Sequence, residues 1–207
     1  MKPSPAIPIP PAYQTLIVCL RGAVNRRPPD SDLTSADWTA LYRQAREQGV
    51  DTYLYPWLAA HVPSLFSLKA PVAADSAPAA WRAGFLAALP HSTRRRKQFA
   101  EILAACAAEH IDVIPLKGAW LSETVYDDPA QRSMSDLDLL IRSDDRDACH
   151  ACFLALGYVT NIETLHNVYC CDQPYRHPSH PLCVELHWHV ESQMVSGCPV
   201  PDIETVW

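Results

Sequence analysis

The sequence predicts an α+β fold, in which helices flank a small mixed β-sheet and a helical region precedes it. Two observations lead to this prediction. Up to about residue 110, apolar side chains recur at helical spacing, whereas beyond it short apolar runs typical of strands alternate with helical segments. The 207 residues are 48% hydrophobic and 19% charged, so the chain can bury a sizeable core, which argues against global disorder.

Residues 1–34 are predicted to form a proline-rich lead-in. Five prolines fall within "PSPAIPIPP", residues 3–11, and this density favours an extended or disordered backbone. No basic stretch followed by an apolar stretch opens the chain, so the sequence indicates no signal peptide.

A helical N-terminal region is predicted over residues 35–110. Its first helix should end near Gly49, and a second, short helix should be interrupted by Pro56. Residues 63–80 are rich in Ala, Pro and Ser and are expected to form a loop or linker. A further helical segment should follow from about 81 to 109.

The remaining residues, 111–207, are predicted to form the sheet-containing core. Apolar runs mark its strands, and a serine followed by two aspartates marks the start of a helix that a glycine ends. In chain order the expected elements are a strand at 111–116, a loop and helix at 117–126, a strand at 136–142, a helix from Ser143 to Gly157 and a strand at 183–190.

Three carboxylates are candidates for a metal site. Asp136 and Asp138 lie in one strand and point to the same face, where their charges repel each other. A divalent cation relieves this repulsion, and Mg²⁺ prefers a few carboxylates together with water and phosphate oxygens. Glu185 lies on the polar face of the last predicted strand and is the candidate third ligand.

Basic side chains near these carboxylates are candidates for phosphate binding. Lys117 and Gly118 fall at a turn from strand to helix, where amide groups attract phosphate and glycine permits close approach. Arg132 precedes the two aspartates and could bind a phosphate with its guanidinium group. "RRRK" at 94–97 lies on a predicted helix and is either a solvated face or a second phosphate contact.

Histidines and cysteines crowd the C-terminal third of the chain. His187 and His189 share a face with Glu185, so either could contact a nucleotide or act as a base. An alternative is a zinc site, although the spacing fits no standard zinc motif. The residues that would form it are His166, His177, His180, His187, His189, Cys170, Cys171 and Cys183.

Three stretches of the chain resemble the uncharacterised bacterial nucleotidyltransferase family of the polymerase-β-like superfamily. They are "LKGAWLSETVYDDPAQRSMSDLDLLIR", "LGYV" and "VELHWHV". The N-terminal stretch "DWTALYRQAREQGVDTYLYPWL" is similar to the helical region of that family, so the resemblance spans about residues 35 to 207.

The resemblance implies a nucleotidyltransferase-type core that moves an NMP from an NTP to an acceptor hydroxyl and releases pyrophosphate. It also implies Mg²⁺, or Mn²⁺ in its place, held by three carboxylates. Carried over by position, these are Asp136, Asp138 and Glu185. Gly118 matches the glycine of the phosphate-binding turn, and the matching basic positions are Lys117 and Arg132.

A non-catalytic module that senses nucleotides or takes part in protein assembly is the alternative function. Ala119 follows Gly118 where the superfamily usually has Ser or Gly, so a hydroxyl contact to phosphate is missing. The chain stops at "IETVW", so the helical part that usually follows is expected to be short or missing.

Composition limits the partners and the compartment. A net charge of −6 argues against a nucleic-acid partner and leaves an unidentified small molecule or protein as the acceptor. No uncharged apolar run reaches the ~18 residues that a membrane helix needs. With eight cysteines and no signal peptide, a cytoplasmic protein with reduced thiols is expected. Nothing in the sequence predicts the oligomeric state.

Overall fold

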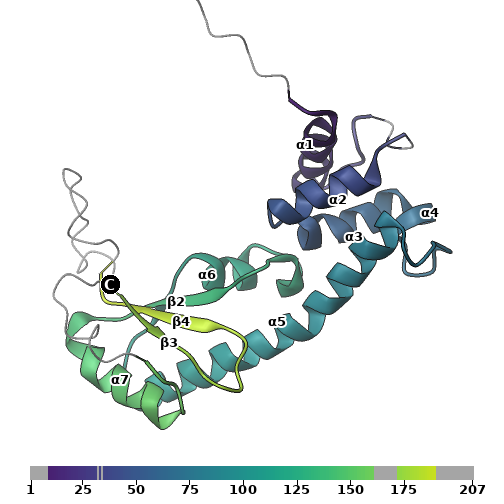
Figure 1. The fold of residues 1–207 in the computed structure, drawn as a ribbon. Coiled ribbons are helices and arrows are strands. Elements are labelled where there is room, and N and C mark those ends of the chain that lie inside the picture. Colours follow the sequence, from purple (N-terminus) through teal and green to yellow (C-terminus); the bar gives the residue numbers. More distant parts are fainter. Residues whose placement is uncertain (1–8, 32, 34, 161–171, 190–207) are drawn as a thin grey trace, which may run out of the picture. The chain divides into compact units, whose positions relative to one another are not determined.

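The computed structural model describes residues 9–31, 33, 35–160 and 172–189 (Figure 1). Within these residues the chain forms seven α-helices and a four-stranded mixed sheet, which confirms the predicted α+β class. It divides into two compact units. Unit 1 comprises Met1–Leu89 with Ala130–Ser133, and unit 2 comprises Pro90–Pro129 with Met134–Trp207.

Unit 1 is helical. Its core is formed by large apolar side chains, among them Leu41, Leu54, Leu58, Phe66 and Trp81. The helices are α1 (Pro11–Val24), α2 (Trp38–Glu47), α3 (Asp51–His61), α4 (Pro63–Phe66) and the first part of α5 (Ala77–Ala108).

Helix α1 was not predicted, because the proline density around it masks a helix start. Pro10 is its N-cap in an extended conformation, and Pro11 occupies the first turn, where a missing amide hydrogen costs nothing. Leu16 and Cys19 then bury one side of the helix in the core of unit 1. The lead-in therefore contains a helix from Pro11, and residues 1–8 lie outside the described residues.

Two further helices differ in extent from the prediction. Pro56 lies inside α3 without interrupting it, and α5 begins at Ala77 and continues through Pro90. By contrast, α2 matches the prediction: the Asp37 carboxylate accepts hydrogen bonds from two amides of its first turn. Gly49, which follows α2, adopts a φ of 65°, the left-handed conformation that glycine favours.

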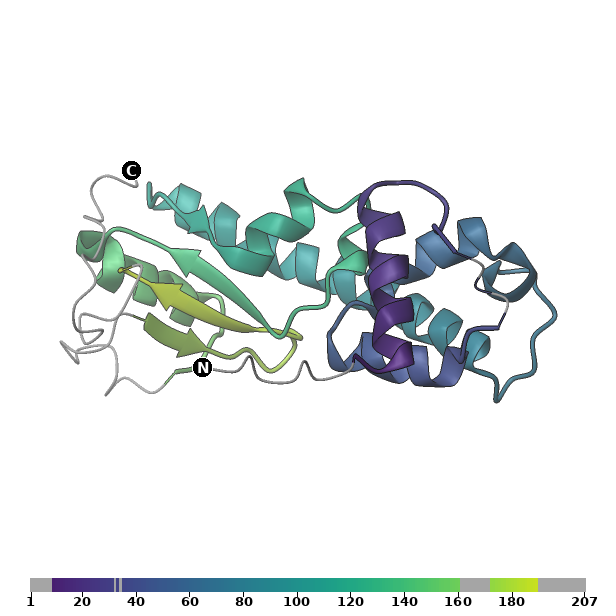
Figure 2. The same cartoon turned by 90° about the horizontal axis from the view of Figure 1, so that it is seen from above.

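Unit 2 contains the sheet, in the order β1-β2-β4-β3 (Figure 2). Strands β2 and β4 are parallel, and β1 and β3 pair antiparallel to β2 and β4. Strand β3 was not predicted, because its sequence "DQPY" contains a proline, which only an edge strand tolerates. The strands are β1 (Ile114–Pro115), β2 (Asp136–Leu140), β3 (Asp172–Tyr175) and β4 (Cys183–His187).

The core of unit 2 lies between one face of the sheet and helices α5 and α7. Leu137 and Leu139 of β2 and Val184 and Leu186 of β4 pack there with Phe153 and other side chains of the two helices. The opposite face of β2 and β4 carries Asp136, Asp138, Glu185 and His187, together with the buried Leu140.

The helix after β2 begins later than predicted. Ser143 starts a short 3₁₀ turn, Ser143–Asp145, and does not cap the α-helix α7, which spans Arg146–Ala155. Gly157 follows α7 with a φ of 90°. Helix α6 (Lys117–Thr124) follows β1 after a single residue, Leu116. Among the described residues, no helix is both long and apolar enough to cross a membrane.

Candidate active site

The parallel pairing of β2 with β4 builds the candidate site. Asp138 lies opposite Glu185 in the register, and Leu140 lies opposite His187. Because successive side chains of a strand alternate between faces, Glu185 and His187 share one face while Leu186 points into the core. The pairing thus brings residues from distant parts of the sequence to one polar surface.

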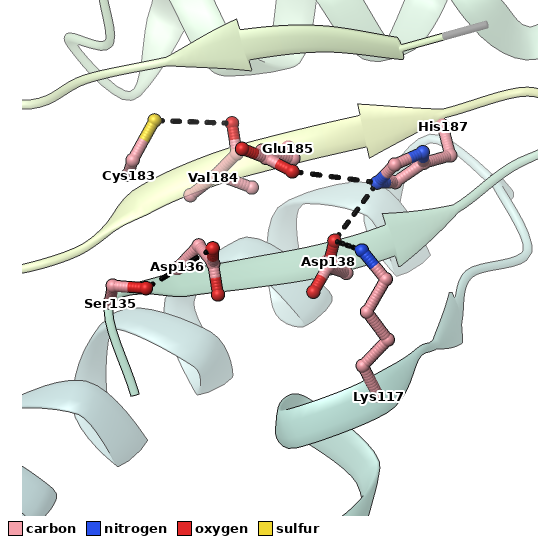
Figure 3. Close-up of polar contacts among 8 residues, drawn as sticks. All are labelled: Lys117, Ser135, Asp136, Asp138, Cys183, Val184, Glu185 and His187. Atoms are coloured by element: carbon pink, nitrogen blue, oxygen red, sulfur yellow. Dashed lines mark hydrogen bonds and ion pairs between the residues drawn. The ribbon is translucent and has the colours of Figure 1, made fainter. Parts of the chain in front are cut away.

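Asp138, Glu185 and His187 meet closely on this surface (Figure 3). The Nε2 atom of His187 lies 3.1 Å from Oδ1 of Asp138 and 3.9 Å from Oε2 of Glu185. One ligand atom from each of the three residues lies within 4.8 Å of the others. Two carboxylates and an imidazole in this arrangement are a donor set that fits a divalent cation.

The ammonium group of Lys117 forms an ion pair with Asp138 of the cluster. Its Nζ donates a hydrogen bond to Oδ1 of Asp138 over 2.6 Å. The backbone N–H of Leu116 donates to the backbone carbonyl of Asp138 over 2.9 Å, which fixes the start of α6 beside the cluster. The Asp138 side chain is only 3% exposed, whereas that of Lys117 is 65% exposed, so the ion pair joins a buried acid to the surface.

The clustered charges shift the pKa values of two site residues. Burial raises the pKa of Glu185, and the negative charges of Asp138 and Asp136 raise it further. The hydrogen bond to Asp138 raises the pKa of Lys117, with support from the charges of Glu185 and Asp136. Negative charge therefore dominates the surface and favours a bound cation.

Asp136 belongs to the same face but not to the cluster. It lies opposite Cys183 in the register, one pair before Asp138, and its Oδ2 accepts a hydrogen bond from the hydroxyl of Ser135 over 3.3 Å. Its charge still acts on Glu185. Thus His187, predicted to bind nucleotide, contributes to the cluster of ligand atoms where Asp136 was expected.

Gly118 and Arg132, the other predicted phosphate-binding residues, belong to different units of the fold. Gly118 is buried in α6, and a Cβ atom there would lie 3.2–3.4 Å from the side chain of Met134, which would have to shift by a few tenths of an ångström. Arg132 belongs to the segment Ala130–Ser133 of unit 1. A role for either residue in phosphate binding stays a prediction.

The side chain of Ala119 is a core group. It is 2% exposed and packs in the hydrophobic cluster of unit 2. A serine in its place would bury its hydroxyl in this core. The missing hydroxyl at this position therefore does not favour a non-catalytic module.

The other basic and histidine-rich groups of the sequence have structural contacts. Within "RRRK", Arg95 is buried and donates to the carbonyl of Pro129, and Arg96 pairs with Glu123 at 3.2 Å. The rings of His177 and His180 are tilted by 47° with their centroids 4.4 Å apart, while His187 contacts Asp138. The predicted zinc ligands His166, Cys170 and Cys171 lie outside the described residues.

One residue that positions the site was missed by the sequence analysis. Gln98 of α5 is fully buried, and its Nε2 donates to the carbonyl of Leu182 over 2.9 Å. Its Oε1 accepts the amide hydrogen of Leu182 over 3.3 Å. Because Leu182 directly precedes β4, Gln98 anchors the strand that carries Glu185 and His187. Only its polar nature on an apolar helix face could have signalled this role.

A family model described as uncharacterised nucleotidyltransferase matches residues 34–205. The chain belongs to this nucleotidyltransferase family. This confirms the predicted family, whose members are nucleotidyltransferases with an NTP as the expected substrate. No curated protein and no solved structure matches the chain.

Proposed function

We propose that this nucleotidyltransferase transfers an NMP from an NTP to an acceptor hydroxyl in a Mg²⁺-dependent reaction that releases pyrophosphate. One observation carries the proposal. In a chain of this family, Asp138, Glu185 and His187 converge within 4.8 Å on the polar face of the sheet, and Lys117 reaches the same acid.

Asp138 and Glu185 would hold the divalent cation, with Asp136 adding negative charge from the next position of β2. A bound cation of this kind neutralises phosphate charge and activates a hydroxyl for in-line attack on phosphorus. The donor set fits such an ion, because two carboxylates at cross-strand positions face the same surface.

Lys117 and the first turn of α6 would bind the triphosphate. The first N–H groups of a helix have no acceptor within the helix and point out of its N-terminal end. Their partial positive charge attracts phosphate. Lys117 occupies the first position of this eight-residue helix, and its exposed ammonium group can turn from Asp138 to a phosphate. Arg132 is the proposed second phosphate contact. A small molecule or a protein is the proposed acceptor, since the net charge of −6 disfavours nucleic acid.

Transfer of a labelled NMP tests this proposal directly. The purified protein is incubated with Mg²⁺ and with each NTP in turn, labelled at either the α- or the γ-phosphate, together with a fractionated cell extract. We expect the α-label to move to one fraction and the γ-label to leave as pyrophosphate. Asp138→Asn should abolish the transfer. Movement of the γ-label to the acceptor, or no transfer and no NTP binding, would contradict the proposal.

A further inference from the structure

The imidazole of His187 places a nitrogen donor beside the two carboxylates of the candidate metal site. Its Nε2 faces Oδ1 of Asp138 and Oε2 of Glu185 at 3.1 and 3.9 Å (Figure 3). We propose that His187 is a direct ligand of the cation and that the site consequently prefers Mn²⁺ to Mg²⁺. This inference rests on the divalent site of the proposed function and adds the identity of a ligand and of the metal.

The strand register makes His187 part of the site. His187 follows Glu185 by two residues in β4 and therefore projects from the same face. Its side chain is 12% exposed and that of Asp138 is 3% exposed, so both are held away from bulk water. A nitrogen donor is thus fixed beside two oxygen donors without any rearrangement of the backbone.

A cationic group already occupies this position in the structure. The ammonium group of Lys117 contacts the same Oδ1 of Asp138 that faces His187. Lys117 comes from a different element, α6, and its side chain is mostly exposed, so it can withdraw while the three ligand residues stay in place. The ammonium group marks the side of Asp138 from which a metal ion would bind.

The donor set determines the preferred metal. Mg²⁺ binds almost entirely through oxygen, whereas imidazole nitrogen suits first-row transition ions. Mn²⁺ accepts carboxylate, water and phosphate oxygens as Mg²⁺ does, and as a first-row transition ion it binds imidazole nitrogen more strongly than Mg²⁺ does. Two carboxylates with one imidazole therefore favour Mn²⁺ over Mg²⁺ in a site that must also accept phosphate oxygens.

Electron paramagnetic resonance of Mn²⁺ tests the proposal without any catalytic turnover. Metal-free protein is titrated with Mn²⁺, first alone and then with Mg²⁺ as a competitor, which gives the two dissociation constants. Electron spin echo modulation reports whether a ¹⁴N nucleus is bound to the Mn²⁺ ion. We expect nitrogen coupling in the wild type. We also expect a ratio of Mg²⁺ to Mn²⁺ dissociation constants at least about tenfold larger in the wild type than in His187→Gln.

Two variants keep the test decisive. His91→Gln removes an exposed histidine of α5 and should keep both the nitrogen coupling and the ratio. His187→Asp replaces the imidazole with an oxygen donor, so it should retain Mn²⁺ without nitrogen coupling and bind Mg²⁺ relatively better. Circular dichroism verifies that each variant is folded. If His187→Gln does not fold, His187→Asp takes its place in the comparison with the wild type.

The outcomes separate this inference from the proposed function. Mn²⁺ bound without nitrogen coupling, or equal metal ratios in the wild type and both His187 variants, would overturn the inference, while transfer of the α-label with Mg²⁺ would leave the function intact. Nitrogen-coupled Mn²⁺ in a protein that transfers no label would support the metal site and contradict the function.

Discussion

Lys117 reaches Asp138 from a backbone conformation that lysine rarely adopts. Its φ is 43°, in the left-handed region, while its Nζ lies 2.6 Å from Oδ1 of Asp138. For a residue with a Cβ atom this conformation costs roughly 1–2 kcal/mol. Strain of this kind persists where the surrounding structure holds it, and it clusters at functional sites. We infer that Lys117 is a counter-ion that a metal must displace from Asp138.

This displacement predicts opposite effects of one substitution on two ligands. Lys117→Met keeps the length of the side chain and removes its charge, so the metal no longer competes with an ammonium group. Without NTP, the affinity for Mn²⁺ should rise about fivefold, equivalent to about 1 kcal/mol. The affinity for an NTP at saturating metal should fall, because a phosphate contact is lost. Isothermal titration calorimetry measures both.

Lys97→Met is the matched control, since Lys97 is an exposed lysine of α5 that pairs with Glu101 at 3.8 Å. It should leave both affinities unchanged. If Lys117→Met weakens the binding of metal, Lys117 supports the metal site and does not compete for it.

The two aspartates of the D-x-D pair should differ in importance for the metal. Asp138 belongs to the cluster of ligand atoms, whereas Asp136 lies one register pair away beside Cys183. Asp138→Asn should therefore weaken Mn²⁺ binding more than about 100-fold, and Asp136→Asn by about tenfold, the lower end of the effect that residues around the direct ligands have. Mn²⁺ titration of both variants measures the difference. Equal losses would place Asp136 among the direct ligands.

Removal of the Glu185 charge should stabilise the metal-free protein at neutral pH. Its pKa is raised above 4.5 by burial and by the two aspartates, so the folded state favours the protonated form. The stabilisation contributed by Glu185 is therefore complete below pH 4.5 and is lost as the pH rises through its elevated pKa. Glu185→Gln should raise the Tm at pH 7 by about 1–3 °C.

Thermal unfolding from pH 4 to pH 8 provides the measurement. The difference in Tm between Glu185→Gln and the wild type should vanish near pH 4, where both side chains are neutral. Saturating Mn²⁺ at pH 7 should reverse its sign, because only the wild type gains the full binding energy. A variant that is less stable than the wild type at pH 7 without metal would contradict this account.

Local pattern was enough to predict the strands and the polar face of the site. Asp138 and Glu185 alternate with buried aliphatic neighbours, and this period of two is visible in the sequence alone. The register that sets Asp138 opposite Glu185 was not predictable, because it depends on pairing between distant segments. The place of His187 in the cluster follows from that register and not from its spacing.

Proline misled the local analysis at Pro11 and Pro174, as it did at Pro56 inside α3, because its effect depends on position. Pro11 begins a helix, where its missing N–H is harmless, and Pro174 lies in an edge strand that has a single neighbour. At Pro11 and at Pro174 tertiary packing decides the outcome. Leu16 and Cys19 bury one side of α1 in the core, and the buried side chain of Tyr175 holds β3 against the core.

The anchoring of β4 by Gln98 gives the last prediction. Nε2 of Gln98 donates to the carbonyl of Leu182 and, over 3.1 Å, to the hydroxyl of Tyr158, and its Oε1 accepts the amide hydrogen of Leu182. Gln98→Leu fills a similar volume but removes the partner of the buried Tyr158 hydroxyl and of the partly buried amide and carbonyl groups of Leu182. This should lower the free energy of opening of β4 by about 2–4 kcal/mol.

Native-state hydrogen exchange of the β4 amides measures that energy. Gln14→Leu, which removes an exposed glutamine that donates to the carbonyl of Ile9, should change it by less than about 0.5 kcal/mol. Because β4 carries Glu185 and His187, Gln98→Leu should also weaken Mn²⁺ binding although Gln98 is not a ligand. Unchanged exchange in β4 would show that the hydrogen bonds of Gln98 are dispensable and that packing alone positions the strand.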